Sequence, residues 1–427
     1  MSKPSLRSRL HTAPLLKQLG PGLITGAADD DPSGIATYSQ GGAQFGFNLL
    51  WTMLLTFPLM AAIQMVSALV GRVTGRGLAY NMGQVLPRPL ALGLLALLFI
   101  ANTINVGADL AAMGEVANLI TGLNQHAFTI FFALLSLGLQ LFIPYRKYAR
   151  FLMVLTFSLF AYVAIMFLLP LDWAQIGAGL IGLHPNLTES AATTIVAIFG
   201  TTISPYLFFW QSAQEVEEVN QNKAEHPLIE RPREGPAAIN RIRIDTIAGM
   251  LASNLVALAI MIATAATLHA HGFTNINTAA DAAKALEPIA GEFAFGLFAI
   301  GIIGTGLLAI PVLAGSAGYA VAEAAGWKTG LDRMPWQARG FYSVIGAAVL
   351  LGLGIDWSPI DPIKALYWSA VLNGVIAVPM MAALMMVASS RRRMGKFRAG
   401  WVLGGLGLLC TAIMAAAAVT MLYVNLN

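Results

Sequence analysis

The sequence predicts an all-α polytopic membrane protein with about eleven transmembrane helices, arranged as two inverted five-helix repeats plus one extra helix. The first observation is the composition: the 427 residues are 57% hydrophobic and only 11% charged, whereas roughly 25% of residues are charged in soluble domains. The second is a series of apolar stretches long enough to cross a bilayer. The third is a pair of stretches that proline and polar residues interrupt.

Stretches of roughly 20 apolar residues are long enough to span about 30 Å of hydrocarbon. Nine such stretches occur, at 46–70, 90–121, 127–144, 151–170, 244–269, 293–322, 340–355, 365–388 and 400–424. Two further segments, 20–45 and 191–219, contain proline and polar residues but lie between clear spans. Counted as broken spans, they bring the expected number to eleven.

The distribution of basic residues tests this count independently, because cytoplasmic loops are enriched in Lys and Arg. With the N-terminus inside, all of the 25 basic residues except Lys284 and Lys364 fall in cytoplasmic segments. We therefore expect a cytoplasmic N-terminus and an external C-terminus, in the inner membrane if the protein is bacterial. The net charge of +4 then fits attraction to anionic lipid of the bilayer, and no nucleic-acid partner is expected. Nothing in the sequence indicates an oligomeric state.

The two broken spans divide the chain into comparable halves. They read "LITGAADDDPSGIATYSQ" and "IFGTTISPYLFFWQSAQEV"; proline removes a backbone donor and disfavours helix at the residue before it. Inverted repeats with interrupted first helices indicate a transporter whose site lies near mid-membrane. The predicted parts are a cytoplasmic segment (1–17), two repeats (18–170 and 190–388) and the eleventh helix (399–427).

Three consecutive carboxylates end the first half-helix. The C-terminal end of a helix is already negative, so a bound cation would relieve Asp29, Asp30 and Asp31. Successive helical residues diverge by about 100°, which makes Asp31, at the break, the best metal ligand, with Asp30 as a further candidate. Across the site, Thr201 and Ser204 offer hydroxyl groups and freed carbonyls. Alternatively, Asp29 and Asp30 pair with Arg or Lys at a cytoplasmic vestibule, or are protonated.

Polar residues elsewhere in the spans are candidates for a transport pathway. Asn102, Asn105 and Asp109 share one helical face, which faces either a wet path or a neighbouring helix; Glu115 lies on another face. Further pathway candidates are Asp29 before the first break, and Tyr206 and Glu215 after the second. Asn373 either approaches the site or packs against another helix.

The first broken span carries a family resemblance. "GPGLITGAADDDPSGIATYSQGGAQFGFNLLW" resembles the first helix of the Nramp family of divalent-metal transporters, with its Gly-Pro-Gly opening and Asp-Pro-Gly-Asn break. The resemblance continues through "GADLAAMGEVANL", the second break and "LEPIAGEFAFGLFAIGIIGTG". It implies a leucine-transporter-type fold and a metal site at Asp31, with the metal as transported substrate. We expect no resident cofactor, since the single cysteine and the His spacing support no redox or thiolate-metal centre.

The chain departs from the family pattern at the site. Gly34 stands where the family has Asn, so a side-chain ligand is lost, and Ser204-Pro205-Tyr206 replaces Met-Pro-His. Gln211 aligns with a family histidine and Ala112 with a glutamate. Gly306-Leu307-Leu308-Ala309 replaces Gly-Gln-Ser-Ser. Residues tied to proton coupling in the family are thus largely missing. Gly34 and Gln211, which align with family site residues, are nevertheless expected at the metal site.

These losses favour a hard ion. A thioether favours softer ions, whereas carboxylates, hydroxyls and water suit Mg²⁺ and Mn²⁺. The pattern is most similar to the Nramp-related magnesium transporter branch, so the sequence predicts a Mg²⁺ or Mn²⁺ permease with weak or absent proton coupling. The alternatives are a proton-coupled Mn²⁺/Fe²⁺ transporter of the same family, a sodium-coupled organic-solute carrier of the same fold, and a non-transporting receptor. An enzyme is not expected, because no His lies in a broken span and no hydrolase motif occurs.

Overall fold

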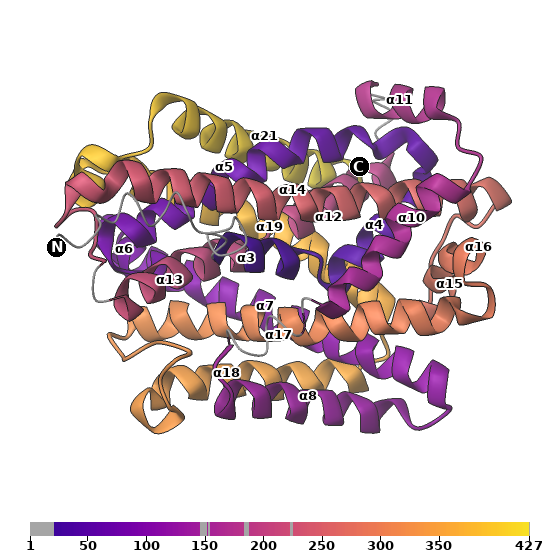
Figure 1. The fold of residues 1–427 in the computed structure, drawn as a ribbon, viewed down its shortest axis with the longest axis horizontal. Coiled ribbons are helices and arrows are strands. Elements are labelled where there is room, and N and C mark those ends of the chain that lie inside the picture. Colours follow the sequence, from indigo (N-terminus) through magenta and orange to yellow (C-terminus); the bar gives the residue numbers. More distant parts are fainter. Residues whose placement is uncertain (1–20, 146–151, 153, 183–187, 223–224, 427) are drawn as a thin grey trace, which may run out of the picture.

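The computed structural model is a bundle of long helices lying roughly side by side (Figure 1). It describes residues 21–145, 152, 154–182, 188–222 and 225–426, and these contain no strand. The all-α prediction is confirmed. The predicted cytoplasmic segment 1–17 lies outside the described residues.

Nine helices or helix pairs of the described chain are long and apolar enough to cross a membrane. The eight uninterrupted ones are α5 (Trp51–Thr74), α7 (Arg88–Thr121), α8 (Gln125–Phe142), α14 (Gly235–Thr267), α17 (Ala294–Ala324), α18 (Arg339–Gly352), α19 (Pro362–Ser389) and α21 (Trp401–Leu426). The ninth is the pair α12 (Glu189–Thr202) and α13 (Pro205–Gln221). The two other predicted spans are helical but are not among these nine: the broken first span, and a shorter apolar helix at Val154–Leu168 that includes α10 (Phe160–Leu168). The count of eleven stays a prediction.

Both predicted breaks are present. The first span consists of α3 (Pro21–Asp29) and α4 (Pro32–Phe45), and the second of α12 and α13. Each second half begins with proline, which is suited to the first helical position. The residues before the prolines are extended, Asp31 with φ −70° and ψ 169° and Ser204 with φ −71° and ψ 135°. The local rule for residues that precede proline therefore explains both interruptions.

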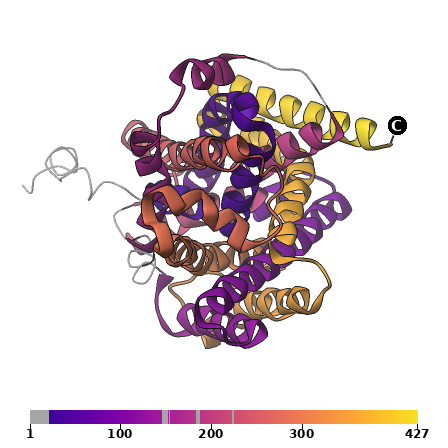
Figure 2. The same ribbon diagram turned by 90° about the vertical axis from the view of Figure 1, so that its right-hand side faces the viewer.

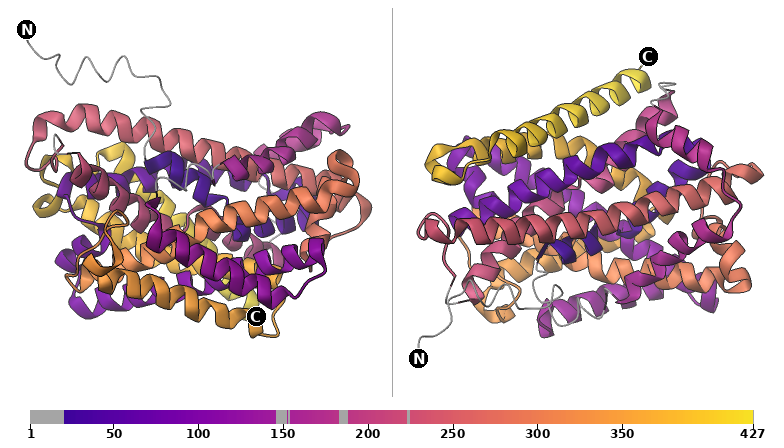
Figure 3. Two further views of the ribbon diagram at one scale, coloured as in Figure 1. Left: turned by 60° about the horizontal axis from the view of Figure 1, so that its bottom comes forward. Right: turned by 45° about the horizontal axis from the view of Figure 1, so that its top comes forward.

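Helix α14 runs alongside both halves of the first broken span (Figure 3). Glycines allow this close approach: a Cβ on Gly26 would lie 2.3 Å from the carbonyl oxygen of Gly249, and one on Gly42 would lie 2.1 Å from Oγ1 of Thr264. In the second broken span, a Cβ on Gly200 of α12 would lie 2.1 Å from the carbonyl oxygen of Ala370 on α19. Small residues thus let the backbones touch, as in membrane helix pairs generally.

The broken spans lie at the centre of the bundle. The most apolar stretch of α12–α13 is 100% buried, whereas that of α21 is 22% buried and that of α8 is 28% buried. Helix α21 lies at one edge in the end-on view (Figure 2). The outer helices expose apolar side chains, which fits a lipid-facing surface.

Several short elements lie between the long helices or at their ends and were not predicted. The short α-helices are α6 (Leu78–Val85), α11 (Trp173–Ile181), α15 (Ala279–Ala283), α16 (Glu287–Ala290) and α20 (Arg391–Met394). The 3₁₀ turns are η1 (Gly46–Leu49), η2 (Phe157–Leu159), η3 (Pro232–Glu234), η4 (His269–His271), η5 (Lys284–Leu286), η6 (Gly291–Phe293), η7 (Pro335–Gln337), η8 (Leu353–Trp357) and η9 (Gly395–Phe397). They are too short for hydrophobic periodicity to identify.

Candidate metal site between the two broken helices

Asp31 lies at the first break and is 2% exposed. Its Oδ1 accepts a hydrogen bond from the backbone N–H of Gly34 at 2.7 Å, so it caps α4. Its Oδ2 accepts one from the hydroxyl of Tyr206 at 3.2 Å. The carboxylate therefore faces the positive N-terminal end of α4. This corrects the expectation that all three aspartates share the negative end of α3, which holds only for Asp29 and Asp30.

The two breaks face one another. Tyr206 on α13 also lies 3.2 Å from the carbonyl oxygen of Ala28 on α3. The hydroxyls of Tyr38 on α4 and Thr202 on α12 are 3.1 Å apart. A Cβ on Gly34 would lie 3.2 Å from Oγ1 of Thr201. The structure thus brings together four of the predicted site residues, namely Asp31, Gly34, Thr201 and Tyr206.

Ser204, at the second break, is 1% exposed. Its hydroxyl oxygen lies 2.7 Å from the carbonyl oxygens of both Gly200 and Thr201, so its proton is used within its own chain segment. A hydroxyl oxygen keeps lone pairs when it donates, and Ser204 can still offer one to an ion. The carbonyl oxygens of Gly200 and Thr201 already accept from the Ser204 hydroxyl, so they are less available to an ion than the sequence suggested.

Asp29 and Asp30 share one partner, Ser253 of α14. The Ser253 hydroxyl oxygen lies 2.6 Å from Oδ2 of Asp29 and 3.0 Å from Oδ1 of Asp30. Among the described residues, no ion pair joins Asp29, Asp30 or Asp31 to Arg, Lys or His. The alternative in which Arg or Lys pairs with these aspartates therefore gains no support.

Within the described ranges, no three His, Cys, Asp or Glu side chains are grouped so that they alone could hold a metal ion. A metal at the breaks would thus also need hydroxyl groups, carbonyls or water. These are the ligands that Mg²⁺, Ca²⁺ and Mn²⁺ accept.

The polar stripe on α7 divides into two parts. Asn102 donates to the carbonyl of Leu313 at 2.9 Å and to the Ser316 hydroxyl at 2.7 Å, which makes it a contact between α7 and α17. Asn105 and Asp109 are fully buried, and none of their side-chain N and O atoms has a hydrogen-bond partner.

Asp109 occupies the part of α7 that approaches the first break. Met113 lies one turn further on the same helix, and a Cβ on Gly306 of α17 would be 2.5 Å from the Met113 sulfur and 3.5 Å from Cγ of Pro32. The start of α4, this face of α7 and α17 therefore converge. An unpaired buried carboxylate at such a place fits a pathway or ion-binding role better than a packing role.

The remaining predicted residues lie away from the breaks or make other contacts. Glu115 accepts a hydrogen bond from the backbone N–H of Ala279, at the start of α15, at 3.0 Å. Glu215 pairs with Arg241 of α14 at 2.5 Å.

Gln211 accepts a hydrogen bond from the Thr25 hydroxyl at 2.5 Å. Thr25 lies one helical turn before Asp29, so Gln211 sits beside α3 rather than at the break. Asn373 is buried on α19 with its amide unpaired.

Sequence reasoning missed two buried residues near the breaks, Ser253 and Gln64. Gln64 is 1% exposed and both atoms of its amide group are unpaired. One turn further along α5, the Ser67 hydroxyl donates to the carbonyl of Phe208 on α13. Because Ser67 lies opposite Phe208, Gln64, one turn earlier on α5, lies beside the start of α13. The available signal was an amide side chain in the middle of a largely apolar span, which in a membrane is a functional-site hypothesis.

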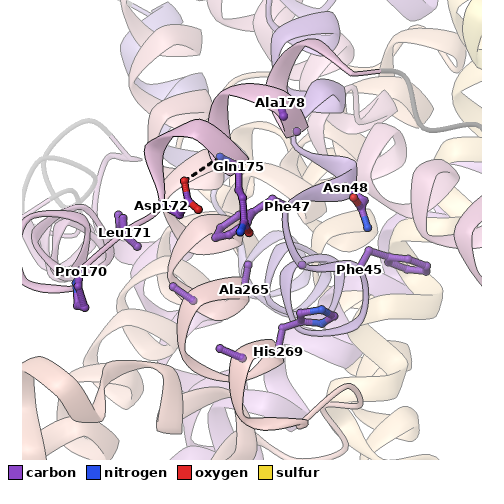
Figure 4. Close-up of a pocket in the computed structure, with 14 residues that line it drawn as sticks. Phe45, Phe47, Asn48, Pro170, Leu171, Asp172, Gln175, Ala178, Ala265 and His269 are labelled. Atoms are coloured by element: carbon purple, nitrogen blue, oxygen red, sulfur yellow. Dashed lines mark hydrogen bonds between the residues drawn. The ribbon is translucent and has the colours of Figure 1, made fainter.

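A separate pocket of about 510 Å³ lies at the far end of α4, between η1, α11 and the end of α14 (Figure 4). Asp172 caps α11 there, accepting from the backbone N–H of Gln175 at 3.1 Å. Nδ1 of His269 lies 2.8 Å from the carbonyl oxygen of Ala43. The pocket contains none of the predicted site residues.

The fold and the buried centre define a polytopic α-helical membrane protein whose polar site lies between two interrupted helices. The family model described as "Natural resistance-associated macrophage protein-like" (Nramp) matches residues 22–424, and the chain belongs to this family.

Curated relatives include the "Divalent metal cation transporter MntH" of Verminephrobacter eiseniae, 26% identical over 392 residues, covering 90% of this chain and 84% of the relative. The protein of the same name from Yersinia pestis is 29% identical over 304 residues, covering 68% and 69%.

Solved structures agree on the fold. The manganese transporter of Eremococcus coleocola, in complex with an aromatic bis-isothiourea substituted compound, superposes with a TM-score of 0.75 at 18% identity, covering 98% of this chain and 88% of that one. The closed form of Mhp1, a nucleobase-cation-symport-1 family transporter, gives a TM-score of 0.60 at 14% identity, covering 95% and 92%. At these identities the likeness concerns the fold alone.

Proposed function

We propose that this protein transports divalent metal cations across the membrane through the site between the two broken helices. The observation that carries the proposal is the Asp31 carboxylate, buried where the two breaks meet and without a basic partner among the described residues. Family membership and the names of the relatives support a metal ion rather than an organic solute.

Mg²⁺ and Mn²⁺ are the proposed ions. Ser204 offers a hydroxyl where the family has a thioether, and Gly34 offers no side chain, so the protein supplies few ligands and all of them are oxygen atoms. Mg²⁺ usually keeps several waters and binds one or two carboxylates. Mn²⁺ is included because a manganese transporter shares the fold and the relatives are named for divalent metals.

Coupling to protons is proposed to be weak or absent. Ala112, Tyr206 and Gln211 stand where the family resemblance places protonatable groups. The second candidate function, proton-coupled Mn²⁺ or Fe²⁺ transport, is favoured by one observation: Asp109 is a buried carboxylate with both oxygens unpaired, and it is the natural proton carrier if coupling exists.

The orientation and the repeats remain part of the proposal. The N-terminus is assigned to the cytoplasm and the C-terminus to the outside, with repeats at 18–170 and 190–388. Their support is the positive-inside distribution.

Uptake of Mn²⁺ and Mg²⁺ into proteoliposomes tests the proposal. Asp31→Ala should abolish uptake while the protein elutes as a single folded species in detergent. Asp31→Asn keeps the shape and the cap acceptor, and should also fail because the charge is lost. Uptake by either variant with unchanged affinity would remove Asp31 from the site, and absence of uptake by the wild-type protein would refute the function.

A further inference from the structure

The cluster of Asp29, Asp30 and Ser253 lies beside the Asp31 site but is built on different elements. The Ser253 hydroxyl oxygen lies 2.6 Å from Oδ2 of Asp29 and 3.0 Å from Oδ1 of Asp30. A serine hydroxyl has a single hydrogen, so it can donate to only one of the two carboxylates. The other carboxylate faces the Ser253 oxygen and needs either a bound cation or a proton of its own.

The surroundings make this arrangement unfavourable without a positive charge. Asp29 is 0% exposed and Asp30 is 6% exposed. The second oxygen of Asp29 is also buried and has no hydrogen-bond partner. Both residues lie at the end of α3, where the helix carbonyls add partial negative charge. Buried charges without partners are costly, and the described chain offers these two no ion pair.

We propose that Asp29, Asp30 and Ser253 bind a second divalent cation, next to the one proposed at Asp31. This inference rests on the proposed function and adds to it a distinct ion position. Two carboxylates and a hydroxyl are hard oxygen ligands, which suit Mg²⁺ and Mn²⁺. The unpaired, fully buried oxygen of Asp29 points to a ligand that the protein itself does not supply.

The two ion positions use different sides of the break. Asp31 directs its oxygens to the backbone N–H of Gly34 and to Tyr206, on the α4 and α13 side. Asp29 and Asp30 face Ser253 on the α14 side. The register of α3 on α14 fixes this second position, since Gly22 N–H donates to Asp245 at 2.7 Å and Gly26 packs on Gly249.

The second position lies on the release side if the N-terminus is cytoplasmic. Asp29 and Asp30 then precede Asp31 toward the cytoplasm, and the Thr25–Gln211 contact follows one turn further. An ion arriving at Asp31 repels an ion held at Asp29 and Asp30, and so promotes its departure. Neighbouring sites that exchange ions in this way allow binding without trapping.

The test counts Mn²⁺ ions bound to the purified full-length protein in detergent by equilibrium dialysis. The wild-type protein should bind two. The double variant Asp29→Asn/Asp30→Asn should bind one, and Asp31→Asn should also bind one. Ser253→Ala should raise the Kd of one ion at least tenfold and leave the other unchanged, whereas Ser253→Thr keeps the hydroxyl and should bind two.

Thr267→Val is the matched control on the same helix, because the Thr267 hydroxyl donates to the carbonyl of Ala263, one turn earlier, at 2.7 Å. This variant should bind two ions. Gel filtration and the unfolding midpoint establish that each variant is folded, and the isosteric Asp→Asn changes keep the test valid if Ser253→Ala is unstable.

A wild-type protein that binds one Mn²⁺, retained in Asp29→Asn/Asp30→Asn and lost in Asp31→Asn, overturns the second site and leaves the proposed function intact. A wild-type protein that binds none overturns both.

Discussion

Replacing Ser204 by Met tests whether this position sets the preference for hard ions. Ser204 is 1% exposed, so a larger side chain must occupy space at the second break. The hydrogen bond that its single proton shares between the carbonyls of Gly200 and Thr201 is lost, at about 0.5–1.5 kcal/mol. Overpacking adds about 1–3 kcal/mol. Mg²⁺ uptake should therefore fall in Ser204→Met even if the sulfur never touches the ion.

Two further variants separate size from sulfur chemistry. Ser204→Leu has similar bulk and no sulfur, and Ser204→Ala removes the hydroxyl without adding bulk. If the thioether binds soft ions, only Ser204→Met should gain Cd²⁺ affinity, by tenfold or more. Ser204→Leu should lose as much Mg²⁺ uptake as Ser204→Met does.

The assay is competition between Cd²⁺ and Mg²⁺ for uptake into proteoliposomes, with each variant reconstituted at the same density. Equal behaviour of the Met and Leu variants toward Cd²⁺ would leave only a steric effect. A wild-type protein that already carries Cd²⁺ or Fe²⁺ better than Mg²⁺ would refute the hard-site reasoning altogether.

Two other predictions concern coupling and packing. A pH-sensitive dye inside the liposomes should report no metal-driven acidification at concentrations that give clear uptake; acidification that follows uptake would contradict this and direct attention to Asp109 or Glu115. Gly26→Ala should lower the unfolding midpoint and the uptake rate, because its Cβ would lie 2.3 Å from the carbonyl oxygen of Gly249 and overpacking costs about 1–3 kcal/mol. Gly346→Ala is the control, since nothing lies within 4 Å of its Cβ and Ala is favoured over Gly in a helix by about 1 kcal/mol; a midpoint lowered equally in both variants would refute the contact argument.

The breaks were predictable because proline acts locally. Pro32 and Pro205 each fix the conformation of the residue before them, and no knowledge of distant residues is needed. The same local rule did not reveal which helix end Asp31 faces. One residue separates the last position of α3 from the cap of α4, and the sign of the helix dipole reverses between them.

Partners on other helices could not be read from the chain. Asn102, Asn105 and Asp109 share a face, yet Asn102 reaches α17 whereas the other two have no hydrogen-bond partner. Periodicity identifies a face but not the neighbour opposite to it. Ser253 was missed for the same reason, because its contacts with Asp29 and Asp30 join residues far apart in sequence.

The two departures from the family pattern at the breaks depend on one another in space. A Cβ on Gly34 would lie 3.2 Å from the Thr201 hydroxyl and 3.3 Å from the ring of Tyr38, so Asn at position 34 would have to displace both. Tyr38 is in turn hydrogen-bonded to Thr202, two residues before Ser204. Restoring Asn at position 34 alone would therefore disturb the second break before it supplied a ligand. The small residues at positions 34 and 204 therefore depend on one another, and at the proposed site the ion would be held by Asp31, by hydroxyl groups and by its own water.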